Sequence, residues 1–498
     1  MAVPGRPLHD AASMRATDRT AIERHGIPGT TLMAAAGAAA ASVARARFPR
    51  ARRVAVLCGG GNNGGDGLVV AALLRARGID ARVAVCASRP YAGDAAWAEA
   101  RARAAGVPFV GVAEALDGAD LVVDALLGTG FSGAPRGAVA EAIAAISAAG
   151  RPVLALDVPS GVDASTGEVA GPAVRADLTV TFHAEKVGLR VAPGTDHAGE
   201  VVPVAIGIPA EAEAPAPAVL AGAGTLAAVP PRPRGGSKYD AGRVVVVAGS
   251  RGMTGAAVLA SRAALRGGAG IVTACVAASL QPVVAASVAE VMTQACPDRD
   301  GALQPGAEDV VARTMQRGGA LVLGPGLGRD AGTAALVRAL IRLEVPLVLD
   351  ADGLHALGEE LELLAGRRAP TVITPHGGEA GRLLGWDRER LAAHRLAAAR
   401  ELAARSGAIA LLKGADTVVA APDGAVAIRE GDEPGLATAG TGDVLSGTIG
   451  ALLARGAEPL LAAAAGAAGH LAAARAAVAA RPGRAIIAGD VADQLPLG

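Results

Sequence analysis

Aromatic residues are nearly absent from this sequence: Phe, Tyr and Trp make up 2% of the 498 residues, whereas hydrophobic residues as a whole make up 51%. The cores must therefore be built from Ala, Val and Leu. An excess of one charge is also lacking, because 47 Lys and Arg residues are matched by 47 Asp and Glu residues. Since no long basic run occurs either, the sequence does not suggest a nucleic-acid partner or an anionic membrane surface.

Cysteine is scarce as well. The four residues Cys58, Cys86, Cys275 and Cys296 are far apart and form no CxxC pair, which excludes the usual zinc spacings. Three of them lie in apolar, strand-like runs, as is typical of buried thiols in a reducing compartment. We therefore expect a cytoplasmic protein.

Two Ala-rich runs come closest to a targeting or membrane segment. Residues 31–44 could pass for the core of a signal peptide, but thirty residues that include acids and helix caps precede them, and Ala is only weakly apolar. Residues 460–480 include His470 and Arg475. We interpret both runs as packed helices, and a cleaved signal is the alternative for the first one.

Strands and helices are expected to alternate along most of the chain, which is too long for a single core. Continuous apolar runs predict two sets of strands, over 53–58, 81–86, 121–127, 152–158, 178–183 and 201–206, and over 243–249, 271–276, 320–324, 346–352, 371–375 and 409–413. Helices fill the gaps, and two more precede the first strand, the second of them capped by Thr30 or Thr31. The pattern predicts an α/β fold in which parallel sheets are covered on both faces, with Rossmann-like layering.

A Pro- and Ala-rich segment separates the two sets of strands. Residues 209–236 include EAEAPAPA and PPRPRGG and break the alternation. Such a composition is typical of linkers between domains. We therefore expect an N-terminal domain over 1–212, a linker over 213–236 and a C-terminal domain over 237–498.

Three segments of the first domain carry polar residues directly after predicted strands. The loop GGGNNGGDG over 59–67 contains Asn62, Asn63 and Asp66, a second loop begins at Gly128, and a third begins at Asp157. In open α/β sheets ligands bind at the carboxyl ends of strands, so these segments should meet in one crevice. The alternatives are a tight strand–helix connection for the first loop and a helix cap for Asp157.

These segments resemble a known family. GGGNNGGDGLVVA, VVDALLGTGFSG, LDVPSGVDASTG and ADLTVTFHAEKVGL are similar to the epimerase domain of NAD(P)H-hydrate repair enzymes over nearly all of residues 10–207. The resemblance implies acid/base catalysis by Asp157 at C6 of the hydrate, with Lys186 as a helper. It also implies a hydrate site at Asn62, Asn63, Gly64, Gly65, Asp66, Gly128, Thr129, Gly130, Phe131, Ser132, Gly133 and Asp157, and a potassium site at Asn63, Asp124 and Ser160. One departure is Leu32-Met33-Ala34, where many relatives have Leu-Met-Glu.

In the second domain, the stretch ATAGTGDVLSG over 437–447 stands out. Its Gly-Thr-Gly-Asp turn leads into an apolar helix, and unpaired N–H groups at a helix start favour a phosphate or oxyanion. Asp443 could take a proton from a hydroxyl group that attacks phosphorus. The alternative is that Asp443 only caps the helix.

The second domain also resembles a family, the ribokinase-like dehydratase partner of the same repair enzymes. RVVVVAGSRGMTGAAVLASRAALRGGAGIVT, LVLGPGLG, LVLDADGL, TVITPHGGE, ALLKGADT and ATAGTGDVLSG occur in family order over 237–490. The resemblance implies ADP and Mg²⁺ as cofactors, with Asp443 as the base. It places the nucleotide at Lys413, Gly414, Ala415, Asp416, Thr417 and Gly442, and the hydrate at Ala256, Gly326, His376 and Asp443.

Several assignments in this domain stay open. Asp352 either caps a helix or assists magnesium, and His376 could be a simple loop residue. Lys238 could reach a phosphate, although Ser237 stands before it where relatives often have His.

Together the two resemblances imply a bifunctional repair enzyme. Its first domain would interconvert the R and S hydrates of NADH and NADPH, and its second would convert the S form to NAD(P)H while ADP gives AMP and phosphate. The alternatives are a ribokinase-like kinase for a small molecule such as a vitamin precursor, and a nucleotide-binding sensor without enzymatic activity. We also expect a homo-oligomer, because α/β domains with Ala-rich outer helices often self-associate.

Overall fold

The computed structural model describes residues 3–232, 234–429 and 431–496, and these form two compact units. One unit comprises Pro7–Ala218, and the other comprises the described residues up to Arg6 together with those from Val219 onward. This division differs from the expected one at both ends. The expected linker over 213–236 contains strand β8 (Ala218–Ala221) and helix α8 (Ala223–Ala227), and its Pro233 lies outside the described residues.

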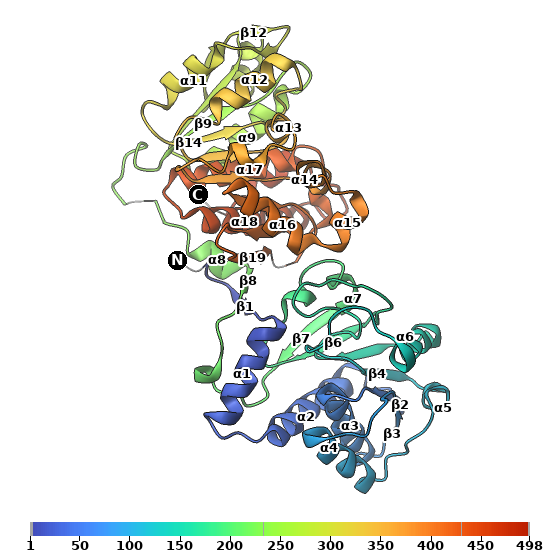
Figure 1. Ribbon diagram of the computed structural model, residues 1–498. Helices are drawn as coiled ribbons and strands as arrows, with labels where there is room; N and C mark the ends of the chain where they lie inside the picture. The colour runs from blue at the N-terminus through green and yellow to red at the C-terminus, as the bar shows by residue number, and fades with distance from the viewer. Residues whose placement is uncertain (1–2, 233, 430, 497–498) are drawn as a thin grey trace. The chain divides into compact units, whose positions relative to one another are not determined.

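The first unit contains a six-stranded sheet whose neighbouring strands all pair parallel, which confirms the predicted parallel sheet (Figure 1). The strand order is β3-β2-β4-β5-β6-β7. The strands are β2 (Arg53–Cys58), β3 (Asp80–Val85), β4 (Leu121–Ala125), β5 (Val153–Leu156), β6 (Leu178–Phe182) and β7 (Glu200–Val204). The helices are α1 (Ala11–Glu23), α2 (Gly29–Arg47), α3 (Asn62–Arg75), α4 (Gly93–Ala104), α5 (Val112–Leu116), α6 (Gly137–Ala149) and α7 (Thr195–Ala198).

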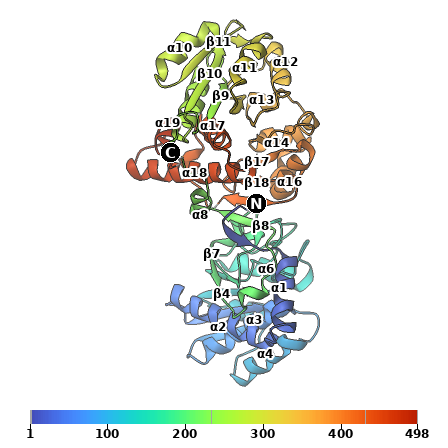
Figure 2. The same ribbon diagram turned by 90° about the vertical axis from the view of Figure 1, so that its left-hand side faces the viewer.

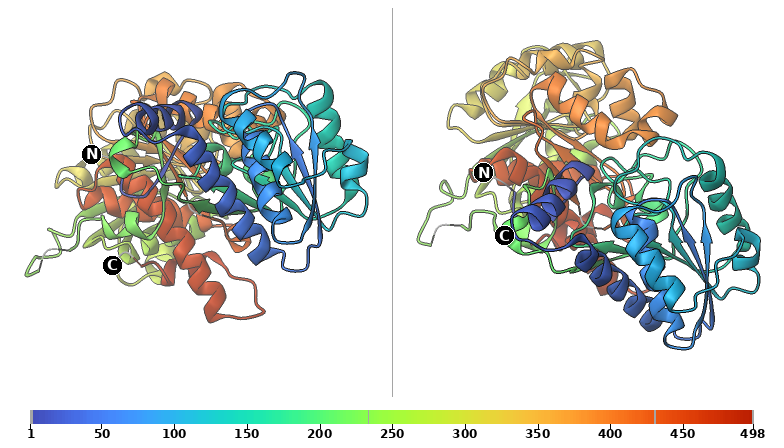
Figure 3. Two further views of the ribbon diagram at one scale, coloured as in Figure 1. Left: turned by 90° about the horizontal axis from the view of Figure 1, so that it is seen from below. Right: turned by 60° about the horizontal axis from the view of Figure 1, so that its bottom comes forward.

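Helices cover both faces of this sheet, because successive side chains of each strand point to opposite sides. In β2, Val54 and Val56 belong to the core beneath α2, α3 and α4, whereas Ala55 and Leu57 belong to the core beneath α5 and α6. Figure 3 shows the blue strands with light-blue helices on one side and teal helices on the other. The three-layer arrangement follows from strands that are apolar on both faces.

Two helix starts differ from expectation. Helix α2 begins at Gly29 with Pro28 as its N-cap, so neither Thr30 nor Thr31 caps it. Helix α3 begins at Asn62 with Gly61 as its N-cap, within the segment over 59–67 that was expected to be a loop. The polar residues of the expected loop over 59–67 therefore lie in the first turns of a helix, whose free N–H groups face the carboxyl ends of the strands.

The second unit contains an eleven-stranded sheet of order β1-β8-β19-β18-β17-β16-β15-β14-β9-β10-β11. From β17 to β11 it is built mostly from the predicted parallel strands, whereas β18 and β19, which extend the sheet from β17 by antiparallel pairing, were not predicted. Besides β8, the strands are β1 (Arg6–Leu8), β9 (Arg243–Val247), β10 (Ile271–Ala277), β11 (Met292–Cys296), β14 (Ala320–Leu323), β15 (Leu347–Leu349), β16 (Thr371–Ile373), β17 (Ile409–Leu412), β18 (Val418–Ala420) and β19 (Val426–Arg429). Strands β12 (Asp298–Arg299) and β13 (Ala302–Leu303) form a separate hairpin.

Two layers of helices enclose this sheet, as Figure 2 shows. One layer holds α9 (Thr254–Arg266), α17 (Thr441–Ala454), α18 (Pro459–Ala480) and α19 (Ala488–Asp493). The remaining helices are α10 (Gln281–Ser287), α11 (Ala307–Met315), α12 (Ala331–Leu340), α13 (Asp352–His355), α14 (Gly377–Leu384), α15 (Arg388–Ala393) and α16 (Arg395–Ser406). Helix α18 has the length and mean hydropathy, 1.3, of a membrane span, and 72% of its apolar window is buried inside the protein.

Candidate active sites

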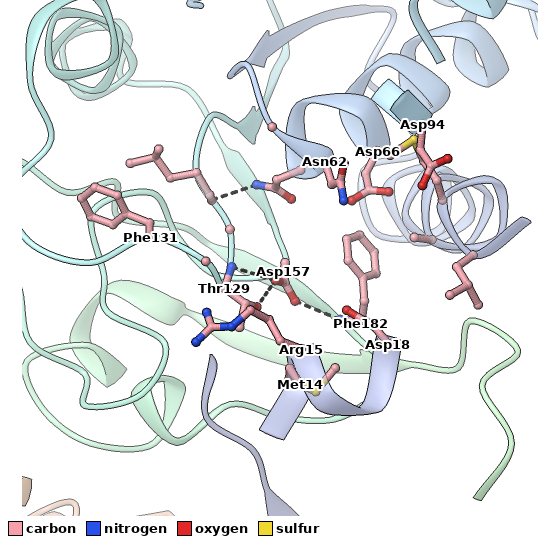
Figure 4. A pocket seen from close by; sticks show the side chains of 18 of the residues that line it. Met14, Arg15, Asp18, Asn62, Asp66, Asp94, Thr129, Phe131, Asp157 and Phe182 are labelled. Atoms are coloured by element: carbon pink, nitrogen blue, oxygen red, sulfur yellow. Dashed lines mark hydrogen bonds between the residues drawn. The ribbon is translucent and has the colours of Figure 1, made fainter. Parts of the chain in front are cut away.

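A cavity of about 620 Å³ opens in the first unit (Figure 4). It is lined by α1, by the start of α3 and by the segments that follow β4, β5 and β6. Of the residues predicted for the hydrate, those that line the cavity are Asn62, Asn63, Asp66, Gly128, Thr129, Gly130, Phe131 and Asp157. The structure thus brings the three predicted segments to one site.

Four predicted hydrate residues do not line the cavity: Gly64, Gly65, Ser132 and Gly133. Two of these glycines serve close packing instead. A Cβ atom at Gly64 would lie 1.9 Å from the carbonyl oxygen of Gly59, and one at Gly65 would lie 2.6 Å from Cε of Met33. They let α3 start directly against the end of β2 and against α2, which brings the side chains of Asn62, Asn63 and Asp66 to the cavity.

Asp157 lies at the centre of a hydrogen-bonded network in this cavity. Its Oδ1 atom is 2.6 Å from Nζ of Lys186, a side chain with only 1% exposure. Its Oδ2 atom accepts hydrogen bonds from the backbone N–H and the hydroxyl group of Thr129. The carboxylate therefore bonds across to two other segments rather than capping the turn that follows it, which rules out the alternative of a simple cap.

The electrostatics of Asp157 favour a carboxylate. Burial opposes its ionisation, but the positive charge of Lys186 and the hydrogen bonds from Lys186 and Thr129 outweigh that effect and lower its pKa. Asp157 also has a φ of 66°, in the left-handed region that is rare for residues other than glycine. A strained, ionised carboxylate in a cavity is the expected form of a general base.

Besides Asp94 of α4, two further carboxyl groups line the same cavity, Asp66 from α3 and Asp18 from α1. Figure 4 shows them with Asp157 around the ring of Phe182. Burial raises the pKa of both, and the negative charge of Asp157 adds to this, so that the pKa of Asp66 lies well above its usual range. Sequence analysis missed Asp18, because α1 precedes the first strand and nothing local links it to the strand ends.

Of the residues predicted to bind potassium, Asp124 and Ser160 bond to each other, and Asn63, which lines the cavity, bonds to Leu127 as Ser160 does. Asp124 is fully buried, and its carboxylate accepts hydrogen bonds from the backbone N–H of Ser160 at 2.8 Å and from its hydroxyl group at 2.6 Å. Burial raises the pKa of Asp124 to about 6, despite these bonds and one from Leu126. Nearby, Asn63 donates to the carbonyl oxygen of Leu127, but its own Oδ1 atom is buried without a hydrogen-bond partner among the described residues.

In the second unit, helix α17 starts within the Gly-Thr-Gly-Asp turn. Gly440 is the N-cap, with a φ of 87° that suits glycine, and no side chain caps the helix. Asp443 is therefore the third residue of the helix and not its cap, contrary to the alternative reading of the sequence. The N–H group of Thr441 donates to the carbonyl oxygen of Thr438 at 3.3 Å, and the next two N–H groups, of Gly442 and Asp443, are available to an anion.

A buried ion pair lies beside this helix start. Nζ of Lys413, which follows β17, is 2.8 Å from Oδ1 of Asp350, which follows β15. Asp350 has 1% exposure, and its Oδ2 atom accepts a 2.6 Å hydrogen bond from Ser446 of α17. A Cβ atom at Gly442 would lie 3.5 Å from Nζ of Lys413, so this glycine keeps the ammonium accessible from the helix start. Asp350 was not predicted as a site residue, although it lies near the end of the strand predicted over 346–352.

The pKa of Asp443 is raised, whereas that of Asp157 is lowered. Burial and the negative charge of Asp350 raise the pKa of Asp443 to about 7, and the nearby Lys413 only partly offsets them. Asp443 therefore changes its charge near neutral pH, the range in which a general base works best.

Two arginines hold the predicted nucleotide loop in place. Arg395 of α16 forms an ion pair of 2.8 Å with Asp416 and donates to the carbonyl oxygen of Lys413. Arg429 of β19 donates to the carbonyl oxygens of Gly414 at 3.1 Å and Ala415 at 2.9 Å. Thr417 closes the loop through a 2.8 Å bond from its hydroxyl group to the Gly414 carbonyl.

Two of the predicted hydrate residues of the second unit, Ala256 and Gly326, lie next to each other. A Cβ atom at Gly326, whose φ is 61°, would lie 2.8 Å from Cβ of Ala256. His376 caps helix α14, because its Nδ1 atom accepts from the N–H groups of Gly378 and Glu379. This bonding assigns the proton to Nε2, and the side chain is 60% exposed. The capping role accounts for the position of His376, and its Nε2 atom lies 3.5 Å from Oε1 of Glu379.

Two residues with open roles are also placed. Asp352 does not cap a helix with its side chain; its Oδ2 atom accepts a 2.9 Å bond from the N–H of Gly328, and its Oδ1 atom pairs with Arg329. Lys238 lies over the ring of the exposed Tyr239, with Nζ 5.5 Å from the ring centre.

Two known protein families match separate parts of the chain, one in each unit. Residues 29–188 match the family described as the YjeF-related protein N-terminus, and residues 244–497 match the family NAD(P)H-hydrate dehydratase. The chain is 42% identical to a bifunctional NAD(P)H-hydrate repair enzyme of Moorella thermoacetica, over 98% of this chain and 96% of that protein. Its identity to the enzyme of the same name from Escherichia coli is 36%, over 93% of this chain and 88% of that protein. A crystal structure of an ADP/ATP-dependent NAD(P)H-hydrate dehydratase from Bacillus subtilis is 28% identical, with a TM-score of 0.46, over 55% of this chain and 94% of that one.

Proposed function

The chain belongs to the bifunctional NAD(P)H-hydrate repair enzymes, and we propose that its two activities are divided between its two units. As a member of that family it is both an isomerase and a lyase, which epimerises hydrated NAD(P)H and dehydrates it to NAD(P)H. The fold agrees with this, since a Rossmann-like unit precedes a ribokinase-like one. The proposed division places epimerisation at the cavity around Asp157 and dehydration at the start of α17. It is supported by the two family matches, which fall in separate units.

In the proposed epimerase site, Asp157 acts at C6 of the hydrate. C6 carries a hydroxyl group and is bonded to the ring nitrogen N1, so inverting it requires that a bond at C6 break and re-form. Loss of the hydroxyl proton lets the C6–N1 bond break, which leaves an aldehyde at C6 and a nitrogen that takes up the proton. N1 then attacks the other face of the aldehyde, and the proton returns to the oxygen. The ionised Asp157 can accept the hydroxyl proton, and the ammonium of Lys186, which is hydrogen-bonded to it, stabilises the carboxylate until then. Because burial raises the pKa of Asp66 well above its usual range, its carboxyl in the protonated form is suited to donate a hydrogen bond to the substrate.

We propose a potassium ion at Asn63, Asp124 and Ser160. The donor set consists of oxygen atoms only, as a hard cation requires. It includes a buried carboxylate and the buried Oδ1 atom of Asn63, which lacks a partner among the described residues. A bound cation would supply the positive charge that keeps Asp124 ionised and would hold Asn63 and the residues after β4 in place around the substrate.

In the proposed dehydratase site, the nucleotide binds to the loop from Lys413 to Thr417 and to Gly442. Asp443 accepts the proton of the C6 hydroxyl group, whose oxygen attacks the β-phosphorus of ADP, so that AMP leaves. The N–H groups at the start of α17 bind the transferred phosphoryl group. Loss of phosphate from C6 and of a proton from C5 then restores the ring double bond of NAD(P)H. Ala256, Gly326 and the Nε2 atom of His376 would contact the hydrate.

Magnesium is proposed to bind together with the nucleotide. The described part of the chain holds no group of three or more His, Cys, Asp or Glu side chains that could bind a metal by themselves. Mg²⁺ commonly uses one or two carboxylates together with substrate phosphates. Asp350, which is already bonded to Lys413 beside the helix start, is better placed for this than Asp352, which is bonded to the loop after β14.

The experiment that tests the function is incubation of mixed (R,S)-NADHX with ADP and Mg²⁺ while absorbance at 340 nm is followed. Complete conversion is the expected result, because the first unit recycles the R hydrate that the second cannot use. Conversion of only the S form, after correction for spontaneous epimerisation, would contradict the role of the first unit. Accumulation of a stable phosphorylated hydrate would instead favour the small-molecule kinase.

We propose that the enzyme works in the cytoplasm and as a homo-oligomer. The four unpaired, buried cysteines support a reducing compartment. Light scattering during gel filtration tests self-association, and a mass equal to that of one chain would contradict it.

A further inference from the structure

The guanidinium group of Arg382, in α14, has no role in the sites described above. Its Nε and Nη2 atoms are buried and have no hydrogen-bond partner among the described residues. A buried polar group without a partner costs free energy, and an uncompensated buried charge costs still more. The folded protein thus maintains a positive group whose anionic partner the described chain does not supply.

Two other side chains, His355 and Arg329, belong to the same region, because Arg329 bonds to Asp352 in the short helix that ends at His355 and the charge of Arg382 acts on His355. His355, at the end of α13, has a buried Nδ1 atom that also lacks a partner among the described residues. Burial lowers the pKa of His355, and the positive charges of Arg382 and Arg329 lower it further. The imidazole is therefore neutral at neutral pH, and it can donate one hydrogen bond to an anion.

The carboxylate near this group does not neutralise Arg382. Asp352 is bonded through Oδ1 to Nε of Arg329 at 3.3 Å and through Oδ2 to the N–H of Gly328 at 2.9 Å. With His355 neutral, Arg329, Arg382 and Asp352 leave one net positive charge. Arg329 is 66% exposed, so the group is open to solvent on the side of the loop that follows β14.

This group adjoins the proposed hydrate site of the second unit. Gly328, bonded to Asp352, is two residues beyond Gly326, which belongs to that site. Arg382 is six residues beyond His376 along α14, which is about 9 Å at the rise of an α-helix. The residues proposed to contact the nicotinamide ring do not also bind the phosphate groups of the dinucleotide. Those phosphate groups must therefore bind to other residues of the second unit.

We propose that Arg382, Arg329 and His355 form a subsite that binds a phosphate group of the dinucleotide hydrate. Guanidinium groups recognise phosphate through paired, charge-assisted hydrogen bonds, and a neutral imidazole adds one more donor. The proposal rests on the proposed dehydratase function. The hydrate offers two phosphate sources, the diphosphate bridge of both substrates and the 2′-phosphate of the NADPH form alone.

The test compares Arg382→Gln with Arg388→Gln, a matched change at an exposed arginine of α15. The KM values for S-NADHX and S-NADPHX are measured with saturating ADP. A charge-assisted bond contributes about 1.5–3 kcal/mol, so Arg382→Gln should raise KM roughly 10- to 100-fold with little change in kcat. An increase for both hydrates indicates the diphosphate, whereas an increase for S-NADPHX alone indicates the 2′-phosphate. Arg388→Gln should leave both KM values unchanged.

Thermal unfolding without ligand separates this role from a structural one. Removing a buried, unpaired charge should keep or raise the melting temperature of Arg382→Gln. A lower melting temperature with unchanged KM values would mean that the arginine stabilises the fold and would overturn the proposal. Unchanged KM values at an unchanged melting temperature would also overturn it.

Binding of NADP⁺ and NAD⁺, neither of which reacts, tests the subsite independently of turnover. Weaker binding by Arg382→Gln than by Arg388→Gln supports it even if the wild-type enzyme converts neither hydrate. That pair of results would contradict the proposed dehydratase function but would support the phosphate subsite. Equal affinities of the two variants overturn the subsite.

Discussion

At the scale of single residues, two aspartates of this chain are both buried but are driven to opposite charge states. Asp157 faces Lys186, whose positive charge helps to lower the pKa of Asp157, whereas Asp443 faces Asp350, whose negative charge helps to raise the pKa of Asp443 to about 7. Both carboxyl groups are proposed to accept the proton of the same hydroxyl group. The first should do so over a wide pH range and the second only when the pH approaches neutrality.

We expect Asp157→Asn to lower the rate of epimerisation by at least about 100-fold, because an amide cannot accept the hydroxyl proton. Interconversion of R- and S-NADHX can be followed by chromatography in the absence of ADP. Dehydration of pure S-NADHX by the same variant should stay at the wild-type rate. An epimerisation rate near that of the wild type would remove Asp157 from the mechanism.

The pH dependence of the dehydration rate should reflect the protonation of Asp443. Because its pKa is raised to about 7, the fraction of Asp443 able to accept a proton falls as pH decreases below that value. We expect kcat/KM for S-NADHX to fall about tenfold per pH unit below pH 7 and to level off above it. Asp443→Asn should lose at least about 100-fold in turnover and should lose this inflection. A wild-type profile that is flat from pH 5 to 8 would contradict the assignment.

At the scale of elements, the nucleotide loop is held by residues that lie outside its own sequence. Arg395 from α16 and Arg429 from β19 bond to four consecutive residues of the loop, Lys413 to Asp416, through one carboxylate and three carbonyl oxygens. The antiparallel strands β18 and β19 bring Arg429 back beside the loop. The family motif identified the loop but not the residues that hold it.

We expect Arg395→Met to raise KM for ADP about tenfold with a smaller effect on kcat, since the loop would pay an ordering cost each time the nucleotide binds. Arg395→Lys should recover part of this effect because it keeps the ion pair with Asp416. Arg400, an exposed arginine of the same helix, provides the control Arg400→Met. An equal change in the control variant would indicate a general effect on α16.

At the scale of the whole molecule, each proposed site is formed within one unit, so the two activities should be separable. Potassium offers the sharpest separation, because its proposed ligands all lie in the first unit. Replacing K⁺ by Li⁺ should slow epimerisation about tenfold or more while the initial rate of S-NADHX dehydration stays unchanged. Asn63→Ala should remove the difference between the two cations. Equal rates of epimerisation in K⁺ and Li⁺ would argue against the cation site.

Much of this organisation could be predicted from the sequence. Continuous apolar runs predicted the parallel strands, and the Gly-rich and Asp-bearing segments after them predicted where polar residues would gather, because parallel strands end at one edge of a sheet. The hairpin of β18 and β19, the strands β1 and β8, and the start of α3 at Asn62 were not predicted. Each of these depends on pairing or packing with residues distant in the sequence.

The sequence by itself determined the fold class, the family and most residues of both proposed sites, since these depend on local periodicity and on motifs of fixed spacing. It did not decide the roles of Asp443 and Asp157, for which a helix cap remained an alternative. Only the tertiary structure decided that Gly440 caps α17 and that Asp157 bonds to Lys186 and Thr129. It also revealed Asp18, Asp350 and Arg382. Burial and nearby charge set the charge state of a side chain, and both arise from residues that are far apart in the chain.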